Sequence, residues 1–425
     1  MRSRVLFCIF LITFDGIYTW GNNTFNHYHS DLGNIITQGG VIRAHSKDAQ
    51  DASLEAKISP MITDEEVDEL LFGDLFSEDL DEESEFDYLP RWYNSLKLET
   101  AIGYADNPLY ANYQPQGSAF GFLGLEALSM SQASSVHQLL LYFLGEGKKY
   151  TDLGNQDLAG MMIGQIDYSF NPAASSFGYG LRIQHTYFDQ GMDFSEIGLP
   201  YRMKVVSNRS GIRPRINWQL NESLKSELEV GFEQEVYQSI NDTSEDLLMA
   251  MKLSGELDER WKWKTGFSAK NTNFKHRNPK TADGNVTGSK LTAKIVEAST
   301  SIEYQHDHRN LEETEFKIGF KRFMDKEGDY YDYQRWKIII NQGLSFEPWS
   351  ADFSMGYSET SYGYRLLDGG QILERSGLNF DLSISYQISE HWISYIKWNH
   401  ESEKSNDPSY LLDANSWSLG VTWEN

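Results

Sequence analysis

From about residue 95 to the end of the chain, apolar and polar residues alternate with a period of two. Between 378 and 388 every second residue is Leu, Phe, Ile or Tyr, and Asn, Asp, Ser and Gln lie between them. The same alternation runs through 224–236 and 417–423. Successive side chains of a β-strand point to opposite faces, so the pattern predicts strands with one apolar and one polar environment.

We expect sixteen such strands, most of them longer than the usual strand of a globular protein. They lie near 95–105, 118–130, 135–146, 158–170, 176–189, 204–219, 223–237, 246–258, 261–274, 290–305, 312–324, 333–346, 350–361, 375–389, 391–401 and 415–424. Strand counts of roughly fourteen or eighteen would also fit the pattern.

The connections between these strands alternate between short turns and long polar loops. The long ones are 106–117, 147–157, 190–203, 238–245, 275–289, 325–332, 362–374 and 402–414. None of them is long enough to suggest a loop that folds inward and constricts a pore. Outer-membrane barrels have this alternation, with short turns in the periplasm and long loops outside.

The predicted fold is therefore all-β: a transmembrane antiparallel up-and-down β-barrel of about 16 strands, residues 93–425. Because backbone groups in lipid find no water, a sheet that crosses a membrane must close on itself. The apolar faces would meet outer-membrane lipid, and the polar faces would line the lumen. A soluble β-sandwich or solenoid is the alternative, although no repeat of fixed period supports a solenoid.

Tryptophans gather near the expected strand ends. Aromatic girdles at the two membrane interfaces would produce this distribution. The candidate interface residues are Trp218, Trp261, Trp263, Trp336, Trp349, Trp392, Trp398 and Trp423.

One pair of neighbouring strands carries opposite charges on its polar faces. The segment 204–219 holds Arg209, Arg213 and Arg215, and 223–237 holds Glu227, Glu229, Glu233 and Glu235. A tight turn near 221–222 would bring them side by side, and opposite charges across strands stabilise the pairing by about 0.2–1 kcal/mol each. Two interpretations stay open: a salt-bridge ladder that stiffens the wall, or a charged stripe along a permeation path.

The first 92 residues differ from the rest. A basic start and the apolar run 5–14 predict a secretory signal peptide over 1–21. Residues 22–92 form an acidic, mostly flexible segment, with a capping box and helical spacing that predict a short helix near 64–72. This segment would contact a periplasmic partner, plug a pore in part, or serve only as a linker.

Composition excludes several classes of protein. The 425 residues carry a formal net charge of −25, which argues against nucleic acid as a partner. Cys8 is the only cysteine, so no disulfide framework exists. No Gly-x-Ser-x-Gly nucleophile elbow occurs, and His306-Asp307-His308 alone is a weak metal signal. We therefore expect no catalytic residues, no metal and no cofactor, and do not expect an enzyme.

Two segments resemble known outer-membrane barrels. The last strand, Asn415–Asn425, is similar to the C-terminal strand that the barrel-assembly machinery reads in Gram-negative bacteria, although two residues follow its final aromatic, Trp423. The run Gly103-Tyr-Ala-Asp-Asn107 resembles the first strand of uncharacterised barrels that carry a Gly-Tyr-x-Asp-Asn motif. The resemblance implies an outer-membrane location and assembly by that machinery, and it implies no reaction.

Sixteen strands enclose an aqueous channel unless something fills it. The leading functional expectation is thus a porin-like passive channel for small solutes. The alternative is a non-conducting barrel that acts as a structural, surface-binding or partner-docking protein of the envelope.

Overall fold

A computed structural model describes most of the chain from Trp92 onward. The signal peptide predicted for residues 1–21 lies outside the described residues, as does the acidic segment predicted for 22–92 except its last residue, Trp92, which begins the first strand. The described ranges are 92–111, 114–134, 136–154, 157–172, 175–193, 202–221, 223–239, 241–281, 285–306, 310–367, 370–407 and 411–425.

Sixteen strands follow one another along the chain, as the alternation predicts. They are β1 (Trp92–Ala105), β2 (Ser118–Ser134), β3 (His137–Tyr150), β4 (Leu158–Phe170), β5 (Phe177–Asp193), β6 (Arg202–Asn221), β7 (Leu224–Tyr237), β8 (Asp242–Asp258), β9 (Trp261–Phe274), β10 (Thr292–Gln305), β11 (Leu311–Asp325), β12 (Tyr333–Phe346), β13 (Trp349–Leu366), β14 (Ile372–Ser389), β15 (Trp392–Ser405) and β16 (Leu412–Glu424).

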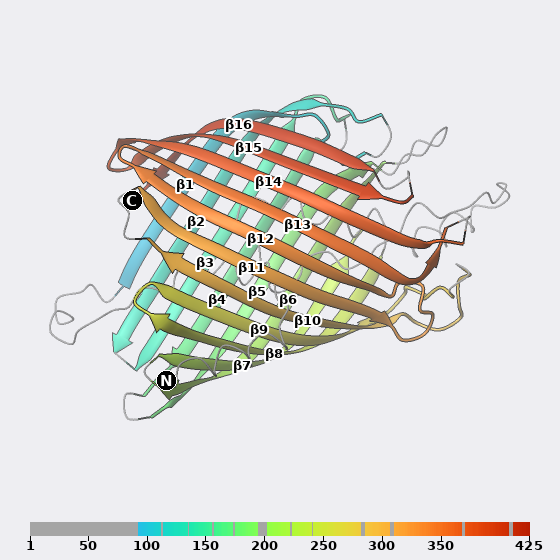
Figure 1. The fold of residues 1–425 in the computed structure, drawn as a ribbon, viewed down its shortest axis with the longest axis horizontal. Helices are drawn as coiled ribbons and strands as arrows, with labels where there is room; N and C mark the ends of the chain where they lie inside the picture. The colour runs from blue at the N-terminus through green and yellow to red at the C-terminus, as the bar shows by residue number, and fades with distance from the viewer. Residues whose placement is uncertain are drawn as a thin grey trace, which may run out of the picture.

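The sheet closes into a barrel (Figure 1). Each strand pairs with its neighbours in the sequence, and β1 pairs antiparallel with β16 from Lys97–Glu424 to Ala105–Ser416. Closure leaves no sheet edge without a partner, which is the condition for a β-structure in lipid. No helix among the described residues is long and apolar enough to cross a membrane.

Short and long connections lie at opposite ends of this barrel, and the C-terminus lies at the short-turn end. Several long connections are shorter than the sequence predicted, because the strands continue past the expected ends. β5 runs to Asp193, and β13 and β14 reduce the expected loop 362–374 to residues 367–371. Extended strands satisfy backbone hydrogen bonds that a loop would leave to water.

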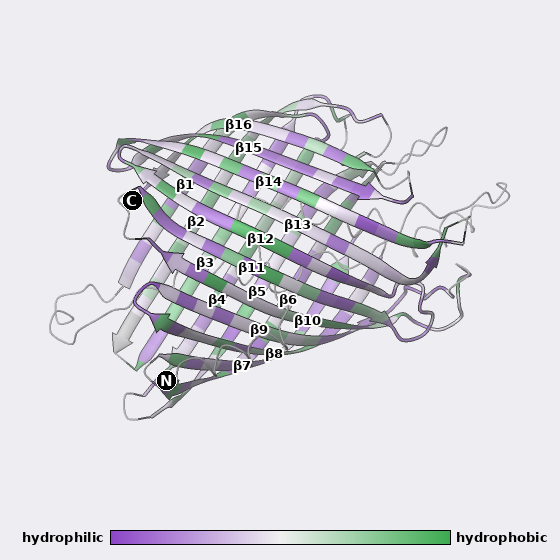
Figure 2. Cartoon of the chain, in the orientation of Figure 1, coloured by the Kyte–Doolittle hydropathy of each residue, from purple (hydrophilic) through white to green (hydrophobic). Residues whose placement is uncertain are grey.

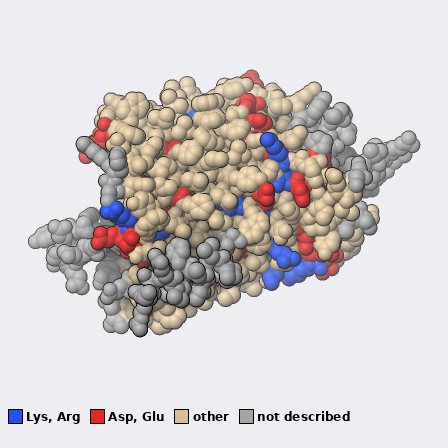
Figure 3. Space-filling view, in the orientation of Figure 1, with Lys and Arg blue, Asp and Glu red and all other residues tan. Residues whose placement is uncertain are grey.

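The barrel is inside-out compared with a soluble protein. Apolar residues such as Ile102, Leu123 and Leu419 are exposed by 70%, 65% and 54%, whereas Arg182 and Glu229 are exposed by only 3% and 2%. Figure 2 shows hydrophobic and hydrophilic residues alternating along the front strands, and few charged side chains lie across the middle of the outer face in Figure 3. Outward apolar and inward polar faces are what lipid outside and a polar lumen require.

The interior departs from this pattern toward the long-loop end. Buried apolar side chains there form one cluster that includes Phe188 on β5, Tyr237 on β7, Phe274 on β9 and Phe323 on β11. Loop residues such as Tyr330 join it. The cluster also runs along β3, where Leu140, Tyr142 and Leu144 are buried. The prediction of a polar inner face is therefore wrong for the long-loop end and for β3.

Candidate functional site in the barrel interior

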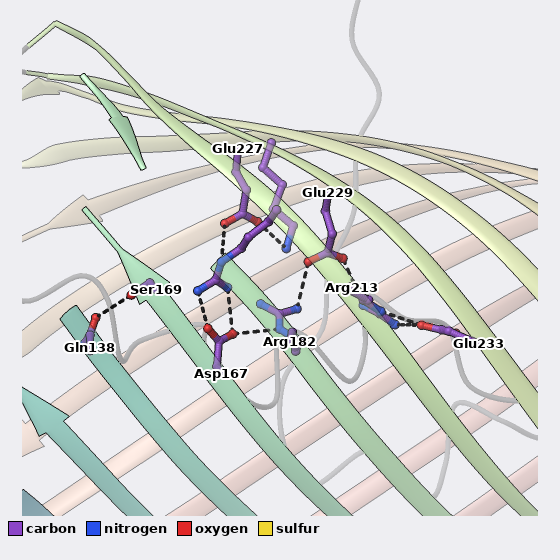
Figure 4. A network of polar contacts seen from close by, with 10 residues as sticks. Gln138, Asp167, Ser169, Arg182, Arg213, Glu227, Glu229 and Glu233 are labelled. Carbon is purple, nitrogen blue, oxygen red and sulfur yellow. Dashed lines mark hydrogen bonds and ion pairs between the residues drawn. The ribbon is translucent and has the colours of Figure 1, made fainter. Parts of the chain in front are cut away.

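A network of charged side chains covers the inner wall of β4 to β7 (Figure 4). Strand register places Asp167 opposite Arg182 across β4 and β5. The Asp167 carboxylate accepts hydrogen bonds from Arg182 Nε at 3.1 Å and from Arg215 Nη1 at 2.8 Å. One carboxylate on β4 thus holds two guanidinium groups from β5 and β6.

A second node of the network lies further along β7. Glu233 accepts a hydrogen bond from Arg213 Nε at 2.6 Å and also pairs with Arg209. Glu229 links the two nodes, because its oxygens lie 3.4 Å from Arg213 Nη1 and 3.6 Å from Arg182 Nη1. The three carboxylates therefore tie four strands together.

The network continues onto β8 and β9 through Asp246. Its Oδ2 lies 3.5 Å from Arg209 Nη2 and 3.6 Å from Lys270 Nζ. All of these groups are buried, and a buried charge is tolerated only when it is paired and hydrogen-bonded. Close pairing explains how so many charges fit on the same stretch of wall.

The predicted charge ladder is present in outline and differs in detail. Register places Arg215 opposite Glu229 and Arg209 opposite Glu235, as the tight turn suggested. Two of the expected neighbours pair: Arg209 pairs with Glu233, and Arg215 Nε lies 3.8 Å from Glu227. Arg215 also turns to Asp167, and Glu235 accepts a hydrogen bond from Tyr237 at 2.9 Å.

Asp167 and Arg182 were missed in the sequence, although they complete the network. Asp167 is the one charged residue of β4, and Arg182 shares β5 with Asp189 and Asp193. Only the alternation of inward and outward residues along the two strands could have placed Asp167 and Arg182 beside Arg215.

Charge also lines the opposite part of the interior. Lys397 Nζ on β15 lies 2.7 Å from Glu99 Oε1 on β1, and Arg375 pairs with Glu403 between β14 and β15. Further round, Lys321 pairs with Glu297 at 3.1 Å. The inner wall therefore carries both signs of charge around its circumference.

The connection between β1 and β2 folds into the barrel, which contradicts the expectation that no loop would do so. The Asn107 side chain closes the turn, donating to the Ala111 carbonyl at 3.0 Å and accepting from the Ala111 N–H at 2.8 Å. The same amide donates to the Asp413 carbonyl at 3.2 Å, which anchors the turn beside β16. The hydrogen bonds of the Asn107 side chain thus let a short loop fold into the barrel, which in other barrels usually takes a long loop.

Residues 107–111, called the inward loop below, reach from the barrel seam to the inner side of β5. The Pro108 carbonyl lies 3.4 Å from Gln190 Nε2 on β5. Leu109 is buried, and Tyr110 holds the left-handed backbone conformation with φ of 54°. Burial and the nearby Glu401 carboxylate raise the pKa of the Tyr110 hydroxyl well above its usual range. The inward loop therefore narrows the interior near the long-loop end.

The Gly-Tyr-x-Asp-Asn motif accounts for this arrangement. Gly103 leaves room for Phe120 and for the Trp417 carbonyl, each of which would lie 2.3 Å from an added Cβ. Asp106 joins the end of β1 to Asn415, and Asn107 forms the clamp. The motif thus closes the barrel seam and turns the loop inward.

Most of the candidate interface aromatics lie at the short-turn end. Trp218 stacks on Phe177 with ring centroids 5.2 Å apart, and Trp261 packs on Tyr304 at 4.5 Å. Trp392 pairs with Trp423 across β15 and β16. Trp263 near the start of β9 and Trp349 at the start of β13 also lie at the short-turn end. Two candidates lie elsewhere: Trp336 is near the long-loop end of β12, and Trp398 is in the middle of β15.

The structure does not support a metal site at His306-Asp307-His308. His306 Nε2 lies 2.7 Å from the Thr314 hydroxyl, and Asp307 and His308 fall outside the described residues. Within the part of the chain that the structure describes, no group of three His, Cys, Asp or Glu side chains could hold a metal ion.

Comparisons with known proteins find likeness in structure and none in sequence. No family model matches the chain. No curated protein matches it either. The crystal structure of Acinetobacter baumannii OccAB3 covers 78% of this chain and 99% of its own at 11% identity, with a TM-score of 0.43. The copper transporter OprC covers 79% and 69% at 11% identity and 0.43, and Pseudomonas aeruginosa OprD covers 78% and 95% at 9% identity and 0.41.

The chain's own architecture gives its location. A closed sixteen-strand barrel with an apolar outer face is a transmembrane β-barrel of the Gram-negative outer membrane. In barrels of this kind short turns face the periplasm and long loops face outside, and we expect the same orientation here.

Proposed function

We propose that this barrel is a passive channel for small polar solutes. The supporting observation is the charged inner wall: buried Arg, Lys, Asp and Glu side chains from many strands face the lumen rather than the lipid. A barrel with only a structural role would gain more from an apolar interior, because burying paired charges adds little or no net stability. Rows of charge that line a path select ions and solutes.

The inward loop and the β4–β9 charge network would define the solute path. Solutes entering from outside would pass the inward loop first and then the mixed-charge wall. Because the arginines of the network are paired with carboxylates, we expect weak selectivity between anions and cations. A passive channel also fits the expectation that the chain is not an enzyme.

Ion selectivity tests the role of the wall. Arg213 lies beside Glu229 and Glu233, so Arg213→Glu would place three carboxylates together. We expect the reversal potential in a salt gradient to shift toward cation preference in this variant. Lys149→Glu is a matched control, because Lys149 is exposed and pairs with Asp157 near the long-loop end. A reversal potential that Arg213→Glu leaves unchanged would count against a path along this wall.

The acidic segment 22–92 remains a candidate plug or periplasmic tether. Its removal would distinguish the two roles, since only a plug changes conductance when it is deleted. A barrel that is folded, inserted and silent with and without the segment would favour the structural or partner-docking alternative.

A further inference from the structure

Three basic side chains lie on the outer surface of the barrel near the long-loop end of β10 and β11. Lys294 on β10, Arg322 on β11 and Lys326 directly after β11 are all exposed. Their strand neighbours Ala293 and Phe323 point inward, with 0% and 2% exposure, so the alternation directs Lys294 and Arg322 toward the lipid. We call Lys294, Arg322 and Lys326 the basic patch.

The members of the basic patch are close neighbours. Register pairs Lys294 with Met324 and Arg322 with Val296, which places the two basic residues on a diagonal of the β10–β11 ladder. The Lys326 N–H donates to the Thr292 carbonyl at 3.0 Å, and its Nζ donates to Asn271 Oδ1 at 3.2 Å. Asn271 is in turn the register partner of Lys294.

The patch lies just above the apolar band. On the same outward face, two residues further into the membrane, Phe320 packs on Trp336 with ring centroids 4.7 Å apart. Tryptophans mark the headgroup level of a bilayer. A charged side chain on the lipid face costs little only near that level. The patch therefore lies among the polar headgroups of the outer leaflet.

The charges of the patch stand out in a chain of net charge −25. Within the described part of the chain, Lys294 and Arg322 make no ion pair. The adjacent Lys275 differs, since it pairs with Glu245 at 2.5 Å. Acidic residues near the patch are the exposed Glu327 and Asp329 in the turn after β11 and the half-buried Asp332. Burial raises the pKa of the Asp332 carboxyl, and Arg322 is close enough to lower that pKa in part, but the two form no ion pair. The leaflet would therefore have to supply a directly bonded anion on the lipid side.

We propose that the basic patch binds the phosphate groups of the outer-leaflet glycolipid, lipopolysaccharide. Arg322 offers the planar donor fork that binds phosphate in two places, and the two lysines add point charges beside it. The Asn271 amide completes a polar rim. A bound glycolipid would neutralise the patch and fix one side of the barrel to its leaflet.

The test compares two variants of the full-length protein that lose the same charge. Lys294→Gln/Arg322→Gln/Lys326→Gln removes the patch. Lys149→Gln/Lys204→Gln/Lys404→Gln removes three outward basic residues on β3, β6 and β15. Each protein is titrated in detergent with lipopolysaccharide, with EDTA present so that divalent cations form no bridges. Heat-modifiable migration on gels confirms that each barrel is folded.

We expect the patch variant to bind lipopolysaccharide about 10- to 100-fold more weakly than the wild type. Each basic residue near an anionic membrane surface strengthens binding by roughly tenfold or less. The control variant should keep wild-type affinity. Dephosphorylated glycolipid should bind the wild type as weakly as intact glycolipid binds the patch variant, and millimolar inorganic phosphate should not compete. Equal losses in both variants, an unchanged patch variant, or competition by free phosphate would overturn the proposal.

Discussion

The Asp106 carboxylate accepts two hydrogen bonds from Asn415, one from its backbone N–H at 2.7 Å and one from its side-chain amide at 2.9 Å. Asp106 follows β1 and Asn415 belongs to β16, so this contact fastens the seam at which the barrel closes. The other end of the seam is fastened by Asn425, whose Oδ1 accepts the Leu96 N–H at 2.6 Å. The residues that follow Trp423 thus contribute to closure.

Loss of the Asp106 carboxylate should loosen the seam. We expect Asp106→Ala to lower the free energy of unfolding by about 1–3 kcal/mol, because two donors lose their acceptor. Asp106→Asn, which keeps one acceptor oxygen, should lose less. Urea titration of both variants in lipid vesicles measures the difference. Equal stability of Asp106→Ala and the wild type would show that the seam does not depend on this contact.

The buried charge network should be sensitive to the loss of one carboxylate. Glu233→Gln leaves Arg209 and Arg213 without their shared partner, and removing one partner of a buried ion pair costs about 3–5 kcal/mol. The control is Asp157→Asn, which breaks the exposed pair with Lys149 and should cost about 1 kcal/mol or less. The same urea titration checks both values, and similar losses in the two variants would refute a special role for the network.

The inward loop should control how much current passes. Tyr110→Gly removes a ring from the interior and suits the positive φ of that position, so the turn should keep its shape. We expect a higher single-channel conductance. Gln116→Ala changes an exposed residue of the same connection and should conduct as the wild type does. A conductance unchanged by Tyr110→Gly would place the narrowest point elsewhere.

The loop after β11 should respond to pH through Asp332. Burial and the nearby Asp329 raise the pKa of this carboxyl above its usual value in the folded protein. The folded state therefore favours the protonated form, and stability is lost as the pH rises through the raised pKa. Asp332→Asn keeps the acceptor for the Asp325 N–H and removes the charge. It should raise the unfolding temperature at pH 7 and leave it unchanged at pH 3; a lower unfolding temperature at pH 7 would contradict the sign.

The strands could be predicted because lipid and lumen impose a period of two on every segment. The register of β6 and β7 also followed from one tight turn between Asn221 and Leu224. The partner of Arg215 on β4 did not follow, since Arg215 reaches past its register neighbour Glu229 to Asp167 two strands away. A long arginine side chain chooses among several carboxylates, and only the three-dimensional wall shows which one is close.

The inward loop and the apolar cluster also escaped prediction. Loop length suggested no constriction, yet the Asn107 clamp folds five residues inward with two hydrogen bonds to Ala111. Inward Phe188 and Tyr237 keep the strand period, so alternation alone does not distinguish an apolar lumen from a polar one. The sequence feature that could have predicted the inward loop is the Asp106-Asn107 pair of the first-strand motif, because Asn107 closes the turn and Asp106 anchors it to β16.

Single-channel conductance of the refolded full-length barrel in a planar bilayer tests the channel proposal most directly, alongside a variant that lacks residues 22–92. The account predicts stepwise, ohmic conductance from the truncated barrel, and from the full chain as well if the segment is a tether. A barrel that is shown to be folded and inserted, and that passes no current in either form, would contradict it.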